Sequence, residues 1–143
     1  MGVVLAEVRN SAVTAAELLD LVRRSDAGAV ALFVGVVRDH DPQASGAVVS
    51  LDYTCHPSAP ERMREIVAGV LASTDPGDGC TVAATHRIGH LVVGDVAFVV
   101  AVSAPHRHLA FAVCEQVVEA VKAGLPVWKQ QFEADGSYRW SGL

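Results

Sequence analysis

The sequence predicts a single α+β domain over residues 1–143. Three segments have the apolar spacing of amphipathic helices, and strand-like segments lie between them in adjacent pairs. The order along the chain is a helix, two strands, a helix, two strands, a helix and a short β tail. Paired strands of this kind favour α+β over a doubly wound parallel sheet. With 51% hydrophobic and 19% charged residues, a chain of this length can form its own core.

The first half of the chain contains the clearest local signals. A capping box, Thr-Ala-Ala-Glu, opens the segment 14–24 and predicts a helix there. The Val-rich apolar run 28–37 is typical of a buried strand. The polar, turn-rich stretch 38–46 predicts a surface loop, and 48–54 predicts a strand that is exposed on one face.

In the second half, Ser-Ala-Pro-Glu at 58–61 has the pattern of another capping box and predicts a helix that ends near Thr74. Strands are expected at 80–86 and 95–103, joined by a glycine-containing loop.

A third helix is expected to begin at 103–105 and to end near Ala123, because Gly124 and Pro126 stop it. Two or three short strands should follow, ending at the aromatic pair of 138 and 140.

Composition excludes several classes of protein. The net charge of −5 argues against a general nucleic-acid binder. The apolar runs 28–37 and 96–102 are too short to cross a bilayer, and the first ten residues do not have the pattern of a signal peptide. The three cysteines form no CxxC pair, which favours reduced thiols. We therefore expect a cytoplasmic protein that binds neither membrane nor nucleic acid.

The lysines are the first candidate for chemistry. The chain has only two, Lys122 and Lys129, and they flank the predicted helix end and the Pro126 bend. Two ammonium groups near one another favour the loss of one proton, so one lysine could act as a general acid, base or nucleophile. From spacing alone, a solvated lysine that complements the helix dipole is the commoner arrangement.

Two further places could hold an anion. Free backbone N–H groups are expected at the start of the third helix, where His106 and Arg107 add positive charge. Arg38 follows directly after the buried strand, at the start of a loop. Ordinary helix capping and a charge that ends a hydrophobic strand are the alternative interpretations.

Metal binding is not predicted. In each of three candidate pairs one requirement is missing: a helix that would bring both side chains to one face, a carboxylate partner, or a sign that the two side chains meet in space. The pairs are His86 with His90, His106 with His108, and Cys55 with His56. We expect no metal and no cofactor.

Four segments in order resemble the large, catalytic subunit of molybdopterin synthase, the MoaE family. They are Gly28-Ala-Val…Phe33-Val-Gly-Val-Val-Arg38, His86-Arg-Ile-Gly-His-Leu…Gly94-Asp95, Ala104-Pro-His-Arg107…Ala110-Phe111 and Lys122…Pro126-Val-Trp-Lys129.

The resemblance implies an α/β-hammerhead fold with an additional small antiparallel β subdomain. It also implies a homodimer flanked by two copies of a small ubiquitin-like sulfur carrier, together a heterotetramer. The carrier's C-terminal Gly-Gly thiocarboxylate would enter a pocket of the large subunit. There, two sulfur transfers to cyclic pyranopterin monophosphate (precursor Z) would form the dithiolene of molybdopterin. The implied activity is that of a sulfurtransferase in molybdenum cofactor biosynthesis.

The resemblance also assigns residues. It makes Lys122 the leading catalytic residue, with Lys129 beside it. The family's substrate-contacting positions correspond to Val36, Val37, Arg38, His106, Arg107, Lys122, Lys129, Gln130 and Gln131. This chain departs from the family at Val36, where the residue is often basic, and at the two glutamines, where charged residues are common.

The length of the third helix predicts a shared site. His106 and Lys122 lie sixteen residues apart, a rise of about 24 Å along a helix. A small pterin cannot touch both ends. We therefore expect a composite pocket, with His106 and Arg107 from one protomer and Lys122 and Lys129 from its mate.

Two other functions fit parts of the pattern. A phosphate-ester hydrolase could use the same cations, but it would need a metal or an activated water. A non-catalytic dimeric subunit could simply dock a ubiquitin-like partner, but docking does not require an amine that can titrate.

Overall fold

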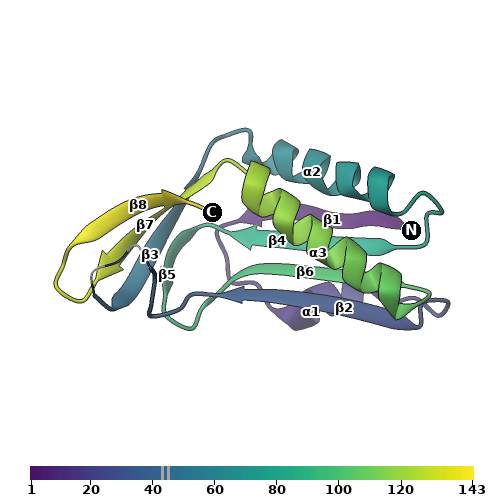
Figure 1. Ribbon diagram of the computed structural model, residues 1–143, viewed down its shortest axis with the longest axis horizontal. Helices are drawn as coiled ribbons and strands as arrows, with labels where there is room; N and C mark the ends of the chain where they lie inside the picture. Colours follow the sequence, from purple (N-terminus) through teal and green to yellow (C-terminus); the bar gives the residue numbers. More distant parts are fainter. Residues whose placement is uncertain (43, 45) are drawn as a thin grey trace.

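Two four-stranded sheets organise the chain (Figure 1). The computed structural model describes residues 1–42, 44 and 46–143. Its elements are β1 (Gly2–Arg9), α1 (Ala15–Val22), β2 (Ala29–Val36), β3 (Val48–Cys55), α2 (Ala59–Thr74), β4 (Thr81–Arg87), β5 (Gly89–Val92), β6 (Val96–Ala104), α3 (Arg107–Gly124), β7 (Val127–Glu133) and β8 (Tyr138–Gly142). This mixed arrangement confirms the expected α+β class.

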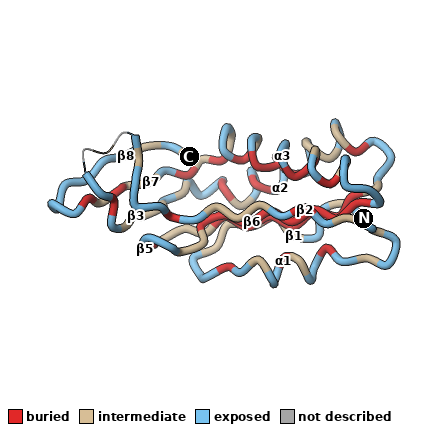
Figure 2. The backbone as a smooth tube through the Cα atoms, turned by 60° about the horizontal axis from the view of Figure 1, so that its bottom comes forward, coloured by how far each residue is buried: buried red, intermediate tan, exposed pale blue. Residues whose placement is uncertain are grey.

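The larger sheet has the strand order β1-β4-β6-β2. Strand β1 runs parallel to β4, whereas β6 is antiparallel to both β4 and β2. Helices α2 and α3 pack on one face of this sheet and the short α1 covers part of the other, as Figure 2 shows. Most of the core therefore lies between the sheet and the helix pair, where side chains such as Val100, Val102 and Val117 are fully buried.

The smaller, antiparallel sheet has the order β5-β3-β7-β8 and lies at one end of the molecule, beyond the larger sheet (Figure 1). One of its faces is anchored by Leu51 and Leu91, which pack with Val37 and Ala97. Strand β7 follows α3 after a bend of two residues. This connection brings the end of α3 next to the small sheet and so positions the site.

The first capping box is confirmed. The Thr14 hydroxyl accepts the Glu17 N–H, and the Glu17 carboxylate accepts the Thr14 N–H at 2.7 Å. The second is wrong, although α2 does begin there. Ser58 makes no side-chain cap, because its backbone is helical (φ −78°, ψ −7°) and not extended like that of Thr14. Its hydroxyl instead lies 2.8 Å from His56 Nδ1. Its backbone carbonyl still accepts the first helical hydrogen bond, from Arg62.

Three boundaries differ from the expectations. The first ten residues contain a strand, β1, which is half-exposed at a sheet edge and pairs with a strand some 80 residues away. The stretch interpreted as a glycine loop contains β5, which begins at Gly89 with φ +95° and pairs with β3. Residues 103 and 104 belong to β6, so α3 begins only at Arg107. Long-range pairing decides all three cases, and local sequence does not report it.

Within the described residues, no helix is both long and apolar enough to span a membrane.

Candidate active site

A cavity of about 290 Å³ lies where the two sheets meet. Its lining is mainly polar and comes from the end of β2, the loop after it, β3, the last turn of α3 and β7. The lining residues are Val36, Val37, Arg38, His40, Asp41, Leu51, Tyr53, Lys122, Lys129 and Gln131. We call this cavity the cationic pocket, after its arginine and two lysines.

The end of α3 brings the two lysines into the same cavity. Lys122 lies in the last turn of the helix, which closes with a hydrogen bond from the Leu125 N–H to the Val121 carbonyl. The chain then bends at Pro126 and enters β7, where Lys129 pairs across the sheet with Tyr53. The seven-residue spacing therefore corresponds to one turn of helix, a bend and the first residues of a strand.

Lys122 is electrostatically distinct. Burial lowers the pKa of its amine, and the positive charge of Lys129 lowers it further, while Glu119 opposes both effects. This is the direction expected for two ammonium groups that share one pocket. A lysine with a lowered pKa can exchange its proton nearer to neutral pH, as acid–base catalysis requires.

Lysine titration offers a direct check. Because the chain has two lysines, ¹³C labelling at lysine Cε gives two side-chain signals that can be followed by NMR. We expect Lys122 to titrate below the ordinary lysine range. Lys129→Met should raise its pKa by removing a like charge, and Glu119→Gln should lower it. If Lys122 titrated normally and neither substitution moved it, the proposed electrostatics would be wrong.

Lys129 is held by a carboxylate from the loop after β2. Its Nζ lies 3.6 Å from Asp41 Oδ2, and the two side chains are 23% and 13% exposed. Gln131, two residues further along β7, is 4% exposed and also lines the pocket. Its amide Nε2 has no hydrogen-bond partner among the described residues. A buried donor without a partner is costly, so a ligand that accepts from it would relieve that cost.

A stack of aromatic rings supports the wall of the pocket. Tyr53 meets the buried His86 edge-on at 5.0 Å, and His86 stacks on Phe98 at 5.3 Å. The His86 Nδ1–H donates to the Arg87 carbonyl at 2.8 Å. Burial lowers the pKa of His86 to about 4, although the bond to Arg87 raises it; the nearby charge of Lys122 lowers it slightly.

His86 should therefore make the fold sensitive to acid. Between its ordinary pKa of 6.5 and about 4, the unfolded chain binds a proton that the folded chain excludes. Stability is then fully present above pH 6.5 and falls as the pH drops, by about 3 kcal/mol from this group alone. Urea unfolding of wild type and His86→Phe should show a steeper acid loss for wild type. Parallel profiles would contradict this.

The structure brings together six of the nine residues that the resemblance assigned: Val36, Val37, Arg38, Lys122, Lys129 and Gln131. His106 and Arg107 do not line the pocket, because they lie at the opposite end of α3. Gln130 does not line it either. Successive side chains of a strand alternate between faces, so Gln130 lies on the outer face of the sheet, paired with Asp52 and Trp140.

Four pocket residues were not assigned from the sequence: His40, Asp41, Leu51 and Tyr53. Leu51 and Tyr53 lie two positions apart on the strand predicted at 48–54, so their side chains share one face of it. That spacing could have identified them as neighbours in the pocket. Nothing local distinguishes Asp41 from the other polar residues of its loop.

No cluster of three or more His, Cys, Asp or Glu side chains suited to a metal occurs in the part of the chain that the structure describes. His90 is one of the histidines considered for a metal. Its Nδ1 instead forms a hydrogen bond of 2.6 Å with Oδ1 of Asp52 on the neighbouring strand.

Comparisons with known proteins place the chain in a family. The sequence model described as MoaE protein matches residues 8–124. The chain is 36% identical over 126 residues to molybdopterin synthase catalytic subunit 1 of Mycobacterium tuberculosis, a match that covers 88% of this chain and 82% of that protein.

Solved structures agree. Molybdopterin synthase from Staphylococcus aureus superposes with a TM-score of 0.85 at 27% identity, covering 96% of this chain and 97% of that one. A complex of subunits 1 and 2 of molybdopterin-converting factor from Helicobacter pylori has a TM-score of 0.70 at 18% identity, over 94% of this chain and 88% of that one, and it shows the shared fold. The chain belongs to the MoaE family, and the relatives it matches are molybdopterin synthase catalytic subunits.

Proposed function

We propose that this chain is the catalytic subunit of a molybdopterin synthase. It would transfer sulfur from the C-terminal thiocarboxylate of a small ubiquitin-like carrier to cyclic pyranopterin monophosphate, forming the dithiolene of molybdopterin. The observation that carries the proposal is the presence of both lysines of the chain in one cationic pocket. Family membership supports the same activity.

Both reactants are anions, and the pocket can attract both. Arg38 and Lys129 supply charge-assisted donors for a phosphate or a thiocarboxylate. Holding the carrier tail and the pterin side by side removes much of the entropic barrier to a bimolecular reaction. The thiocarboxylate sulfur would bond to a side-chain carbon of the pterin substrate as an oxygen leaves that carbon. Water would then cleave the bond between the sulfur and the acyl carbon and release the carrier as a carboxylate, and Lys122 would move the protons in both steps.

His106 and Arg107 can take part in the site if they reach the cationic pocket from a second copy of the chain. They lie at the start of α3, about 24 Å along the helix from Lys122. We infer a homodimer in which the α3 helices of the two copies run antiparallel. Each pocket would then combine Lys122 and Lys129 of one protomer with His106 and Arg107 of the other.

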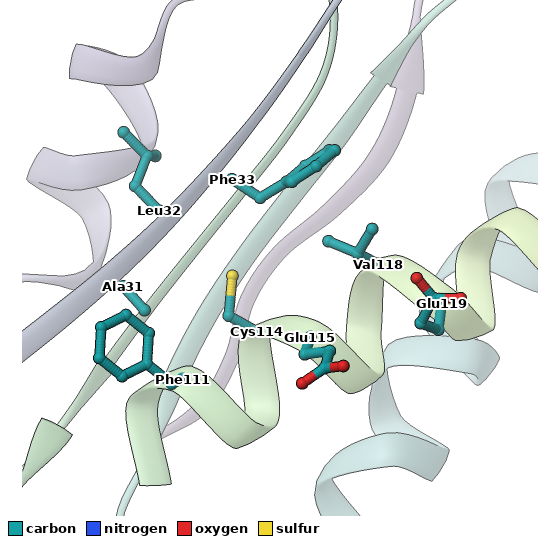
Figure 3. Close-up of a pocket in the computed structure, with 8 residues that line it drawn as sticks. All are labelled: Ala31, Leu32, Phe33, Phe111, Cys114, Glu115, Val118 and Glu119. Carbon is teal, nitrogen blue, oxygen red and sulfur yellow. The ribbon is translucent and has the colours of Figure 1, made fainter. Parts of the chain in front are cut away.

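A largely apolar groove, whose lining also includes Glu115 and Glu119, supports this arrangement (Figure 3). It has a volume of about 330 Å³ and lies between β2, which is an edge strand, and the middle of α3. Leu32 from β2 and Phe111 from α3 line it and are 41% and 66% exposed. An exposed apolar surface of this kind favours burial against a second copy. A two-fold axis here would pass near the centre of α3 and place the start of α3 from one copy beside the end of α3 from the other.

Mixed dimers test the composite site. Lys122→Ala and Arg107→Ala proteins should each be inactive in a dithiolene assay with thiocarboxylated carrier and precursor Z. Mixed after dissociation, they should recover about a quarter of wild-type activity, because half of the dimers are mixed and each has one intact site. Reassociation of each variant with itself is the control. No recovery in a mixture with demonstrated exchange would contradict the shared site.

Two further features complete the proposal. The core cluster contains residues of both sheets, such as Val100 of β6 and Val127 of β7, which supports one large-subunit domain over residues 1–143. The three cysteines are free thiols, which supports a cytoplasmic location.

A further inference from the structure

The cationic pocket contains one acid whose presence the binding of anions does not explain. Asp41 lines the pocket with Arg38, Lys122 and Lys129. Its side chain is 13% exposed, and its Oδ2 lies 3.6 Å from the amine of Lys129. A carboxylate in this position repels any phosphate or thiocarboxylate that approaches Lys129. A pocket that served anions alone would bind them better with a neutral side chain here.

The surroundings of Asp41 suit a flat, polar ligand. Lys129, its partner, pairs across the sheet with Tyr53, and the next inward residue, Gln131, pairs with Leu51. Burial raises the pKa of Tyr53, so its ring stays uncharged. The pocket therefore contains the carboxylate of Asp41 as an acceptor, the aromatic ring of Tyr53 and the aliphatic side chain of Leu51. It also contains the amide of Gln131, a donor whose Nε2 has no partner among the described residues.

The chemistry of the substrate class supplies what a carboxylate needs. A pterin carries an N–H and an amino group side by side on its pyrimidinone ring, and both point in the same direction. A carboxylate can accept both N–H groups at once in a planar, bidentate arrangement. Simple phosphates have no such edge. A carboxylate beside a cluster of cations therefore matches a ligand with a donor edge at one place and a phosphate at another.

We propose that Asp41 determines specificity by accepting hydrogen bonds from the amino-pyrimidinone edge of the pterin while it repels anions that lack such an edge. The inference rests on the proposed function for the identity of the substrate. In this arrangement Asp41 orients the pterin ring. Arg38 and the remaining cations of the assembled site bind the phosphate. Asp41 thereby lowers the affinity for inorganic phosphate and raises the affinity for the phosphorylated pterin.

Asp41→Asn tests the proposal because the change preserves size and removes the charge. An asparagine presents an N–H where the pterin also presents one, so bidentate acceptance is lost. We expect the affinity for unphosphorylated pterin, followed by its fluorescence, to fall about tenfold, and the affinity for inorganic phosphate to rise about threefold. The KM for precursor Z should rise with little change in kcat, and Asp41→Glu should restore part of the pterin affinity.

Asp39→Asn is the matched control. It removes one acid from the same loop, but Asp39 does not line the pocket. It should change neither affinity, and a similar Tm for all variants shows that the fold is intact.

Each result separates the alternatives. If Asp41→Asn binds both probes more tightly, the carboxylate is only a counter-ion of Lys129 and the proposal is overturned. A parallel loss for both probes, or no change in either, also overturns it and indicates a structural role or none. If wild type makes no dithiolene from precursor Z and thiocarboxylated carrier, the proposed function fails. If wild type is active and the opposed shifts are absent, only the role of Asp41 fails.

Discussion

Replacing Lys122 by glutamine is expected to lower kcat for dithiolene formation by about a thousandfold, the scale of a lost general acid–base group. The amine lines the cationic pocket, and its pKa is lowered by burial and by the charge of Lys129. Glutamine keeps a polar side chain that is one atom shorter, but it carries no charge and cannot exchange a proton. The rate of product formation at saturating carrier and precursor Z measures the effect.

Lys122→Arg is the matched variant for this prediction. Arginine keeps the positive charge, but its guanidinium does not lose its proton in the accessible pH range. We expect this variant to be nearly as inactive as the glutamine variant while it binds the anionic carrier tail almost normally. An arginine variant with more than about a tenth of wild-type activity would show that charge alone suffices. A glutamine variant with normal activity would favour a docking role without catalysis.

The substitution Phe98→Ala is expected to lower the free energy of unfolding by about 3–5 kcal/mol. Phe98 is 1% exposed and lies between Phe33, at a ring distance of 5.8 Å, and His86, at 5.3 Å. Removing its ring leaves a cavity in the centre of the core and ends two aromatic contacts. Urea unfolding at pH 7.5, where His86 is neutral, measures the change without interference from acid.

Tyr138→Ala provides the contrast for this prediction. Tyr138 is 58% exposed on β8, so loss of its ring should cost less than about 1 kcal/mol. Phe98→Leu should lie between the two, because leucine fills part of the space. If Phe98→Ala were as stable as Tyr138→Ala, the stack of Phe98, His86 and Tyr53 would not be the support of the pocket that we describe.

Local features of the fold were predictable where the interactions are local. The capping box at Thr14 and Glu17 formed as expected because its two hydrogen bonds join residues three positions apart. At Ser58 the same pattern formed no cap, because the backbone there is already helical and the hydroxyl meets a histidine two residues earlier. Strands β1 and β5 were missed for a related reason: each is defined by a partner far away in the sequence.

The amino-acid sequence was enough to predict the fold class, the family resemblance and the residue types that can carry chemistry, above all the only two lysines of the chain. How these residues are combined in one site depends on the packing of the two sheets. The register of β7 against β3 points Lys129 and Gln131 into the pocket and Gln130 away from it, and the loop after β2 brings Asp41 to Lys129. Composition and periodicity report how a residue relates to its neighbours in sequence. A binding site depends on distances between segments that meet only when the sheets pack.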